Sequence, residues 1–162
     1  MRTDGNRPVI LYLDASALVK RYFLEPYSED VISRWKSATQ IITSSVAYAE
    51  TMASMYRKKR ESDLADTRIR KIADTFYQDW ESFIRVEVND NLNGYIDRVL
   101  QKYPLRGFDA IHLASAMVIH EKLPEDFVFV CFDDRLARAA QSEGLETFPT
   151  EEIRGQATFQ PL

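Results

Sequence analysis

Four acidic side chains stand where charge is least expected in this sequence. Asp14 follows the apolar run VILYL, and Asp133 follows the apolar run FVFVCF. Asp109 lies at the start of the apolar stretch FDAIHLASAM, and Glu50 ends the segment SSVAYAE, which is rich in small residues. Two carboxylates about 5 Å apart repel by roughly 3 kcal/mol at an effective dielectric near 20, and a helix N-terminus relieves only about 0.3–1 kcal/mol. If the four meet, a divalent cation is the natural counter-charge, and oxygen ligands suit Mg²⁺ or Mn²⁺.

The elements that must position these residues are two strands and the helices that follow them. The runs 9–13 and 127–132 are apolar without alternation, which is typical of strands buried between two layers of helices. In open α/β sheets the site lies off the carboxyl ends of the strands. We therefore expect Asp14 and Asp133 at that edge, with Glu50 and Asp109 on neighbouring first turns of helices.

The rest of the chain alternates strands with helices, and this pattern indicates a parallel sheet covered on both faces. The expected architecture is a three-layer α/β/α sandwich with a central parallel sheet of about five strands. No internal repeat or linker interrupts it, so we predict a single domain over 1–162, with a polar lead-in at 1–7 and a tail at 149–162. The other predicted strands are 40–43, 84–88 and 145–148, and the predicted helices cover 15–23, a short segment from 28, a segment ending near 60, and 63–83, 90–104, 107–121 and 135–143.

Composition narrows the class of protein. The net charge of −4 argues against a protein that binds nucleic acid through an overall positive charge. It does not argue against an enzyme that contacts phosphate through a bound cation. Cys131 is the single cysteine, so no internal disulfide is possible and a reducing compartment is expected. The start MRTDGNRP does not resemble a signal peptide, and no apolar run is long enough to span a bilayer. We expect a soluble, cytoplasmic protein.

Each acidic residue also has a purely structural interpretation. Asp14, Asp109 and Asp133 are suitable caps for the helices that follow them, and Glu50 is a suitable partner for an arginine. Taken singly, the structural and functional interpretations are equally good, because structural ion pairs also gather charge. Taken together, the four residues favour a metal site.

Four segments in this order resemble the PIN-domain family, and most closely the VapC-type toxins of type II toxin–antitoxin systems. The segments are YLDASALVKRY, SSVAYAE, LRGFDAIHLASA and FVCFDDRLARAA, and the resemblance runs from about Ile10 to Phe148. Cys131 is a departure, because the family commonly has threonine before the last aspartate.

The resemblance implies which residues form the site. A strand-end aspartate, a helical glutamate and two later aspartates bind Mg²⁺ or Mn²⁺ in that family. These roles fall on Asp14, Glu50, Asp109 and Asp133, which would be both the metal ligands and the catalytic residues. Ser16 matches the hydroxyl residue that often supports the site, and Asp134 is a neighbour that could share the role of Asp133.

The resemblance also implies an activity and its partners. The expected activity is a Mg²⁺- or Mn²⁺-dependent endoribonuclease that hydrolyses RNA phosphodiester bonds and leaves 5′-phosphate and 3′-hydroxyl ends. The expected partners are the RNA substrate, a second copy of the chain in a homodimer, and an antitoxin whose C-terminal segment occupies a groove between the early helices. Most of the large side chains in these helices should be core, but some of the aromatic residues are candidates for lining that groove, namely Tyr22, Phe23, Tyr27, Tyr48 and Tyr56.

Several charged residues near the site are ambiguous. His112 follows Asp109 by three residues on nearly the same helical face, but we interpret it as a packed helix residue because Mg²⁺ sites favour oxygen. The basic run 57–60 is more consistent with a solvated helix face than with an RNA contact. Lys20, Arg21 and Arg106 lie nearer the predicted site and are candidates for guiding RNA.

Other enzyme classes fit less well. A phosphatase of the haloacid-dehalogenase type needs a second aspartate two residues after the first, where this chain has Ser16. A phospho-receiver domain needs a late lysine that is absent. An inert binding module with the PIN fold is disfavoured because all four acidic residues are present. A PIN nuclease that acts on structured RNA or DNA outside any toxin system remains an open alternative.

Overall fold

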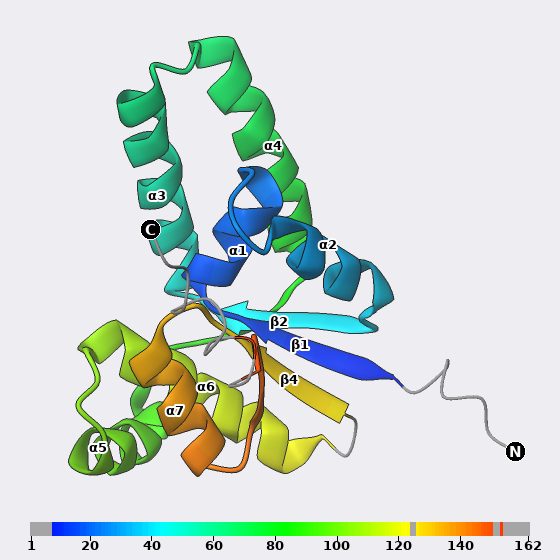
Figure 1. Ribbon diagram of the computed structural model, residues 1–162. Helices are drawn as coiled ribbons and strands as arrows, with labels where there is room; N and C mark the ends of the chain where they lie inside the picture. The colour runs from blue at the N-terminus through cyan, green and yellow to red at the C-terminus, as the bar shows by residue number, and fades with distance from the viewer. Residues whose placement is uncertain (1–7, 124–125, 151–152, 154–162) are drawn as a thin grey trace, which may run out of the picture.

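A computed structural model describes residues 8–123, 126–150 and 153. Its centre is a five-stranded sheet in which every pairing is parallel, in the order β3-β2-β1-β4-β5 (Figure 1). The predicted parallel sheet is therefore confirmed. The strands are β1 Val9–Leu13, β2 Gln40–Ser44, β3 Ile84–Val86, β4 Asp126–Val130 and β5 Glu146–Phe148.

Helices cover both faces of the sheet, as the predicted three-layer arrangement requires. The first four helices lie on one face and the last three on the other (Figure 1). The hairpin of α3 and α4 extends well beyond the sheet. The helices are α1 Ala15–Tyr22, α2 Ser28–Ser37, α3 Ala47–Ser62, α4 Asp66–Ser82, α5 Asn93–Lys102, α6 Gly107–Lys122 and α7 Asp134–Ser142, and the 3₁₀ helix η2 Asp90–Leu92 precedes α5.

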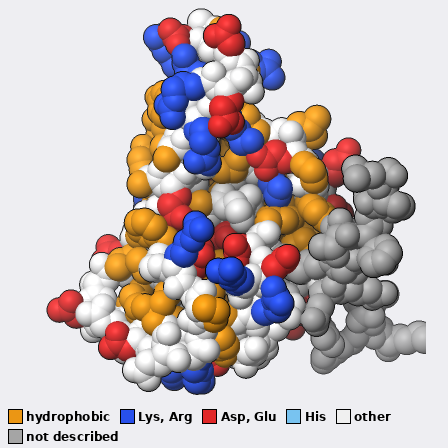
Figure 2. Space-filling view, turned by 60° about the vertical axis from the view of Figure 1, so that its left-hand side comes forward, with side chains coloured by type: hydrophobic (Ala, Val, Ile, Leu, Met, Phe, Trp, Pro, Cys, Tyr) orange, Lys and Arg blue, Asp and Glu red, His pale blue; other side chains and the backbone are white. Residues whose placement is uncertain are grey.

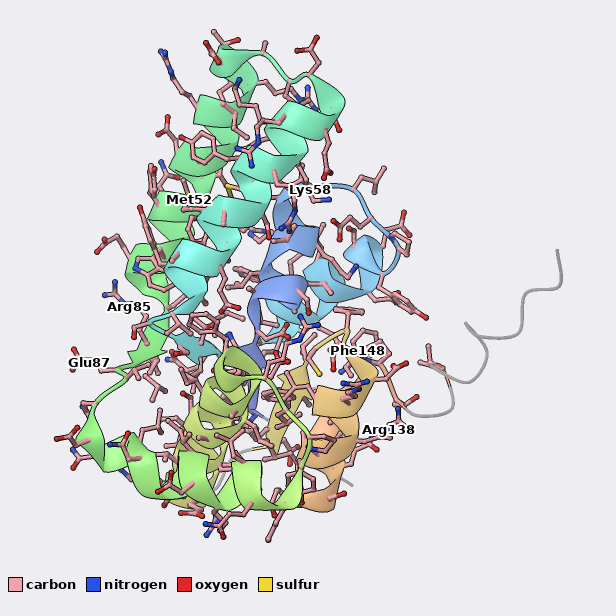
Figure 3. The ribbon with its side chains drawn as sticks, turned by 90° about the vertical axis from the view of Figure 1, so that its left-hand side faces the viewer. Met52, Lys58, Arg85, Glu87, Arg138 and Phe148 are labelled. Atoms are coloured by element: carbon pink, nitrogen blue, oxygen red, sulfur yellow. The ribbon has the colours of Figure 1, made fainter. Side chains whose placement is uncertain are left out.

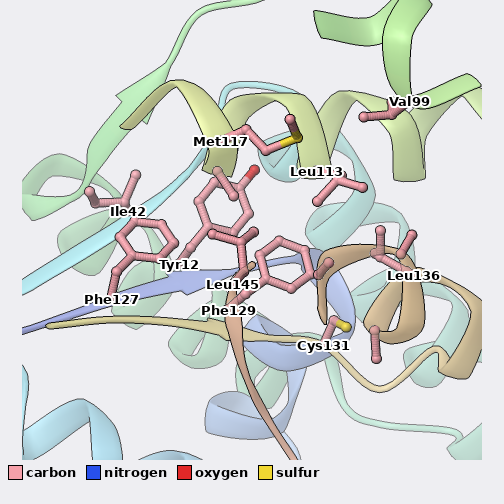
Figure 4. Packing of buried hydrophobic residues seen from close by; sticks show 14 of the residues in the cluster. Tyr12, Ile42, Val99, Leu113, Met117, Phe127, Phe129, Cys131, Leu136 and Leu145 are labelled. Carbon is pink, nitrogen blue, oxygen red and sulfur yellow. The ribbon is translucent and has the colours of Figure 1, made fainter. Parts of the chain in front are cut away.

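The central strands lack polar alternation because each packs against helices on both faces. In β1, Tyr12 faces the layer of α5–α7 and stacks on Phe129 at a centroid distance of 5.2 Å (Figure 4). Leu11 and Leu13 belong to the other core, which lies under α1–α4. Burial on both sides therefore explains the continuous apolar runs that mark β1 and β4.

Several boundaries differ from the sequence-based expectation, and the strand predicted at 84–88, for example, ends at Val86. Three further differences have a local explanation. Residue Asp63 does not start α4 but ends α3, with a left-handed φ of 48° that aspartate tolerates better than most residues. A 3₁₀ turn replaces the first turn of the predicted helix 90–104. The strand predicted at 127–132 ends at Val130, because beyond it the amide of Phe132 bonds to Ser16 Oγ on α1.

The strand order places a topological switch beside β1. From β1 the chain moves outward to β2 and β3, and it then returns to the other side of β1 to form β4. The last residues of β1 and β4, Leu13 and Val130, lie in register. Ligands of open α/β sheets bind outside such a switch point, and Asp14 and Asp133 follow these strand ends directly.

The lead-in at 1–7 and most of the tail at 149–162 lie outside the described residues. Within the described part of the chain, none of the helices is both long and apolar enough to cross a membrane.

Candidate active site

Asp14 sits at the carboxyl end of β1 and caps α1. Its Oδ1 accepts hydrogen bonds from the Ala17 amide at 3.0 Å and from Ser16 Oγ at 2.6 Å. The residue is only 5% exposed. Burial raises the pKa of Asp14 to about 6, with a further rise from Glu50, and His112, Ser16 and the Ala17 amide offset part of this increase. Asp14 is thus both a helix cap and a buried carboxylate that lacks a full counter-charge.

Ser16 connects the ends of the two central strands. Its hydroxyl donates to Asp14 Oδ1 and accepts from the Phe132 amide at 3.2 Å. The bond to Phe132 ties α1 to the segment that leads from β4 to Asp133. The supporting role predicted for Ser16 agrees with this position, since the hydroxyl restricts the rotation of the Asp14 carboxylate.

Glu50 lies in the first turn of α3, and its partner is a histidine rather than the arginine considered above. His112 Nε2 lies 2.7 Å from Glu50 Oε1, and His112 Nδ1 lies 2.8 Å from the hydroxyl of Tyr12. His112 is 1% exposed, so it is the packed helix residue that we expected. It is also bonded directly to a predicted site residue, which the sequence analysis missed although the spacing from Asp109 pointed to it.

Asp109 and Asp133 face one another across the start of α6 and the end of β4. Burial raises the pKa of Asp109, the nearby Asp133 carboxylate raises it further, and His112 and Arg106 act in the opposite direction. Asp133 caps α7, because its Oδ1 accepts from the Leu136 amide at 2.9 Å. A pocket of about 190 Å³ is lined by both aspartates together with Pro104, Leu105, Arg106 and Arg135.

The four predicted acidic residues lie near one another without forming a closed ligand set. The Glu50 carboxylate contributes to the raised pKa values of Asp14 and Asp109, and the Asp133 carboxylate contributes to that of Asp109. Within residues 8–123, 126–150 and 153, however, no group of three or more His, Cys, Asp or Glu side chains is close enough to hold a metal ion. Asp134, the first residue of α7, is exposed.

The donor chemistry nevertheless suits a hard cation. The carboxylates of Asp14, Glu50 and Asp133 each make their described hydrogen bonds through a single oxygen, Oδ1 or Oε1. Oxygen donors of this kind are those that Mg²⁺ and Mn²⁺ prefer. Burial raises the pKa of Asp14 and Asp109, and neighbouring carboxylates raise it further. A cation near them would offset the repulsion between these carboxylates.

A groove of about 520 Å³ leads away from Ser16 and Glu50 between α1 and α3. Glu25 crosses this groove, because it pairs with Lys20 of α1 at 3.1 Å and with Lys58 of α3. Burial acts to raise the pKa of Glu25, but its bonds to Lys58 and Lys20 outweigh burial and lower it. The remaining lining residues are Ala15, Val19, Ala53, Ser54, Arg57 and Glu61.

The aromatic residues suggested for this groove do not line it. Tyr48 turns toward α4, where its ring lies 5.3 Å from that of Trp80 and 6.2 Å from that of Tyr77. Met52 of α3 also packs against the core under α1–α4, whereas Lys58 reaches toward α1 (Figure 3). The groove walls are therefore built from small and charged side chains.

The three basic residues predicted to guide RNA lie in different surroundings. Lys20 lines the groove and Arg106 lines the pocket beside Asp109. Arg21 instead binds Asp79 of α4 at 2.8 Å and lies over the ring of Trp35, so it joins helices away from the site. On the face of the molecule that Figure 2 shows, Lys and Arg side chains lie beside Asp and Glu side chains.

Comparisons with known proteins agree with this architecture. The family model described as PIN domain matches residues 11–142. Ribonuclease VapC45 of Mycobacterium tuberculosis is 30% identical over 146 residues, which cover 88% of this chain and 96% of that protein.

Two solved structures share the fold. The first is VapC20 of Mycobacterium tuberculosis, described as a sarcin-ricin loop cleaving toxin, with a TM-score of 0.56 and 16% identity over 80% of this chain and 94% of that one. The second is a toxin–antitoxin complex from Klebsiella pneumoniae, with a TM-score of 0.56 and 15% identity over 78% of this chain and 90% of that one. The parallel sheet order and these matches point to the same family. The chain belongs to the PIN domain family as a VapC-type member.

Proposed function

We propose that this chain is a Mg²⁺- or Mn²⁺-dependent endoribonuclease and the toxin of a toxin–antitoxin pair. The observation that carries the proposal is the chain of mutually interacting carboxylates at the carboxyl edge of the sheet, Asp14, Glu50, Asp109 and Asp133. A relative that is named a ribonuclease and shares 30% identity over nearly its whole length supports it.

Asp14, Glu50, Asp109 and Asp133 would hold the cation. When bound, it supplies Lewis-acid polarisation of the phosphate and lowers the pKa of a water molecule. Ser16 keeps the Asp14 carboxylate oriented. Arg106 and Arg135, which line the pocket with Asp109 and Asp133, are suitably placed to hold an RNA phosphate. A carboxylate of the same cluster would accept the proton of the attacking water, and in-line attack would leave 5′-phosphate and 3′-hydroxyl ends.

The groove between α1 and α3 is our candidate site for the antitoxin. It opens beside Ser16 and Glu50. A segment bound there would therefore obstruct the acidic edge, by which we mean the edge of the sheet that carries Asp14, Glu50, Asp109 and Asp133. A structural neighbour that was solved as a toxin–antitoxin complex supports the proposal of such a partner. A homodimer and a cytoplasmic location remain part of the same proposal, the latter because Cys131 is the single cysteine, so no internal disulfide can form.

Cleavage of a mixed RNA pool by the purified protein tests the proposal. With Mg²⁺ or Mn²⁺ we expect cutting that a chelator abolishes and that Asp109→Asn reduces strongly. The matched control is Asp97→Asn, an aspartate-to-asparagine change on the exposed surface of α5. Equal activity of Asp109→Asn and wild type would overturn the assignment of the site. Cutting of DNA in preference to RNA would favour a PIN nuclease outside a toxin system.

Glu25→Gln is expected to strengthen RNA binding. The substitution releases Lys20 and Lys58 from their shared carboxylate, and both then face the groove with their charge uncompensated. One extra phosphate contact steepens the dependence of log K on log salt by about 0.7 for a single strand. Titration of a labelled RNA at several salt concentrations measures this slope.

Glu29→Gln, an exposed change on α2, serves as the control for this prediction. The same slope in Glu25→Gln, Glu29→Gln and wild type would show that RNA does not use the groove.

A further inference from the structure

We propose that His112 is a positioning residue that holds Glu50 in place at the acidic edge, and that Tyr12 fixes the histidine tautomer that does so. The inference rests on the proposed function, because it assigns Glu50 a role in the metal-binding cluster. It concerns residues that are not themselves part of that cluster.

Three separate segments meet in this arrangement. Tyr12 comes from β1, Glu50 from α3 and His112 from α6, and the two hydrogen bonds of the imidazole span 100 and 62 residues of sequence. Tyr12 is fully buried, and its ring meets the imidazole edge-on at 5.9 Å. Figure 4 shows the Tyr12 hydroxyl directed toward α6. Tyr12 therefore constrains the Nδ1 side of the imidazole, and the Nε2 side is the one that contacts Glu50.

The direction of the hydrogen bonds follows from chemistry. The Tyr12 hydroxyl is a hydrogen-bond donor, and His112 Nδ1 is its described partner. The phenol donates to His112 Nδ1, which leaves the proton of a neutral imidazole on Nε2. Nε2–H then donates to Glu50 Oε1. A carboxylate ligand that is itself hydrogen-bonded in this way is oriented by its neighbour.

Glu50 needs such an anchor because of its own surroundings. Its side chain is 28% exposed, and the carboxylates of Asp14 and Asp109 both repel it. An unanchored glutamate would rotate toward water to escape that repulsion. The described bond to His112 uses Oε1, so Oε2 is not engaged by the histidine and could serve as a ligand.

The first arm of the test compares His112→Leu with His112→Gln. Leucine removes the donor, whereas the amide of glutamine can replace Nε2–H. We expect His112→Leu to bind Mn²⁺ about 10- to 100-fold more weakly, with a lower kcat for RNA cleavage and a nearly unchanged KM. We expect His112→Gln to recover most of the affinity. His120→Gln is the matched control, because His120 lies on the same helix but packs at a tilt against Phe127.

The second arm is the ¹⁵N NMR spectrum of the metal-free wild type, which reports which ring nitrogen of His112 carries the proton. We expect the Nε2–H form, and a proton on Nδ1 alone would overturn the inference. Tyr12→Phe keeps the stacked ring and removes only the hydroxyl. The same measurements can therefore be made on Tyr12→Phe if His112→Leu does not fold. Tyr12→Phe should have a weaker preference for Nε2–H, since only Glu50 then favours that form, and it should bind Mn²⁺ more weakly.

The outcomes separate the two proposals. Wild-type affinity and kcat in folded His112→Leu, alongside a wild type that binds Mn²⁺ and cuts RNA, would overturn the positioning role alone. A wild type that neither binds Mn²⁺ nor cuts RNA would overturn the proposed function, and the positioning role with it.

Discussion

Asp14→Asn is expected to lose RNA cleavage by at least about 100-fold, which exceeds the usual effect of changing a residue that only supports a metal ligand. Asparagine preserves the shape of the side chain, and its oxygen can still accept from Ser16 Oγ and the Ala17 amide. The change therefore removes the negative charge while leaving the cap of α1 in place. Initial rates with saturating Mn²⁺ measure the loss.

Asp30→Asn, an exposed change near the start of α2, is the control for this result. It should cut RNA at the wild-type rate. If Asp14→Asn retained more than a tenth of the wild-type rate, Asp14 could not be a ligand of the catalytic cation.

The same substitution is expected to stabilise the metal-free protein at neutral pH. Burial raises the pKa of Asp14 from its ordinary value of 3.8 to about 6 in the folded state. Between these values the folded state holds more protons than the unfolded state, so the free energy of unfolding falls as pH rises. Above pH 6 the difference amounts to about 3 kcal/mol, since one pKa unit corresponds to about 1.4 kcal/mol. Asp14→Asn removes this destabilisation because asparagine carries no charge. The net gain in the free energy of unfolding is smaller than this by the cost of burying an amide.

Urea unfolding with chelator at pH 4 and at pH 7.5 checks the prediction. We expect the two proteins to differ little at pH 4 and the variant to be the more stable at pH 7.5. Added Mn²⁺ should then stabilise the wild type and not the variant, because a ligand stabilises only the state that binds it. A variant that was less stable than wild type at pH 7.5 in chelator would contradict the account of Asp14.

These two expectations have one cause. The buried carboxylate of Asp14 destabilises the metal-free fold and is needed for binding the cation, so activity and stability change in opposite directions. Such a trade-off is common where a site holds charges that the fold alone does not compensate.

Much of this protein was determined by short stretches of sequence. The doubly apolar runs that became β1 and β4 required helices on both faces, and an aspartate directly after each run placed both carboxylates at the same edge of a parallel sheet. Capping explained these positions equally well, and Asp14 and Asp133 do cap α1 and α7. The family resemblance depended on the same local segments.

Only the tertiary structure decided which side chains became partners. The bond from His112 to Glu50 joins residues 62 apart in sequence. The spacing of three residues from Asp109 placed His112 near the site, but it could not indicate Glu50 as the partner. Glu25 joins α1 to α3, and Arg21 turns to Asp79 instead of the site. The pKa of Asp14 depends first on burial. Caps and periodicities act over one helical turn, whereas these contacts depend on how whole helices pack on the sheet, which no short stretch of sequence specifies.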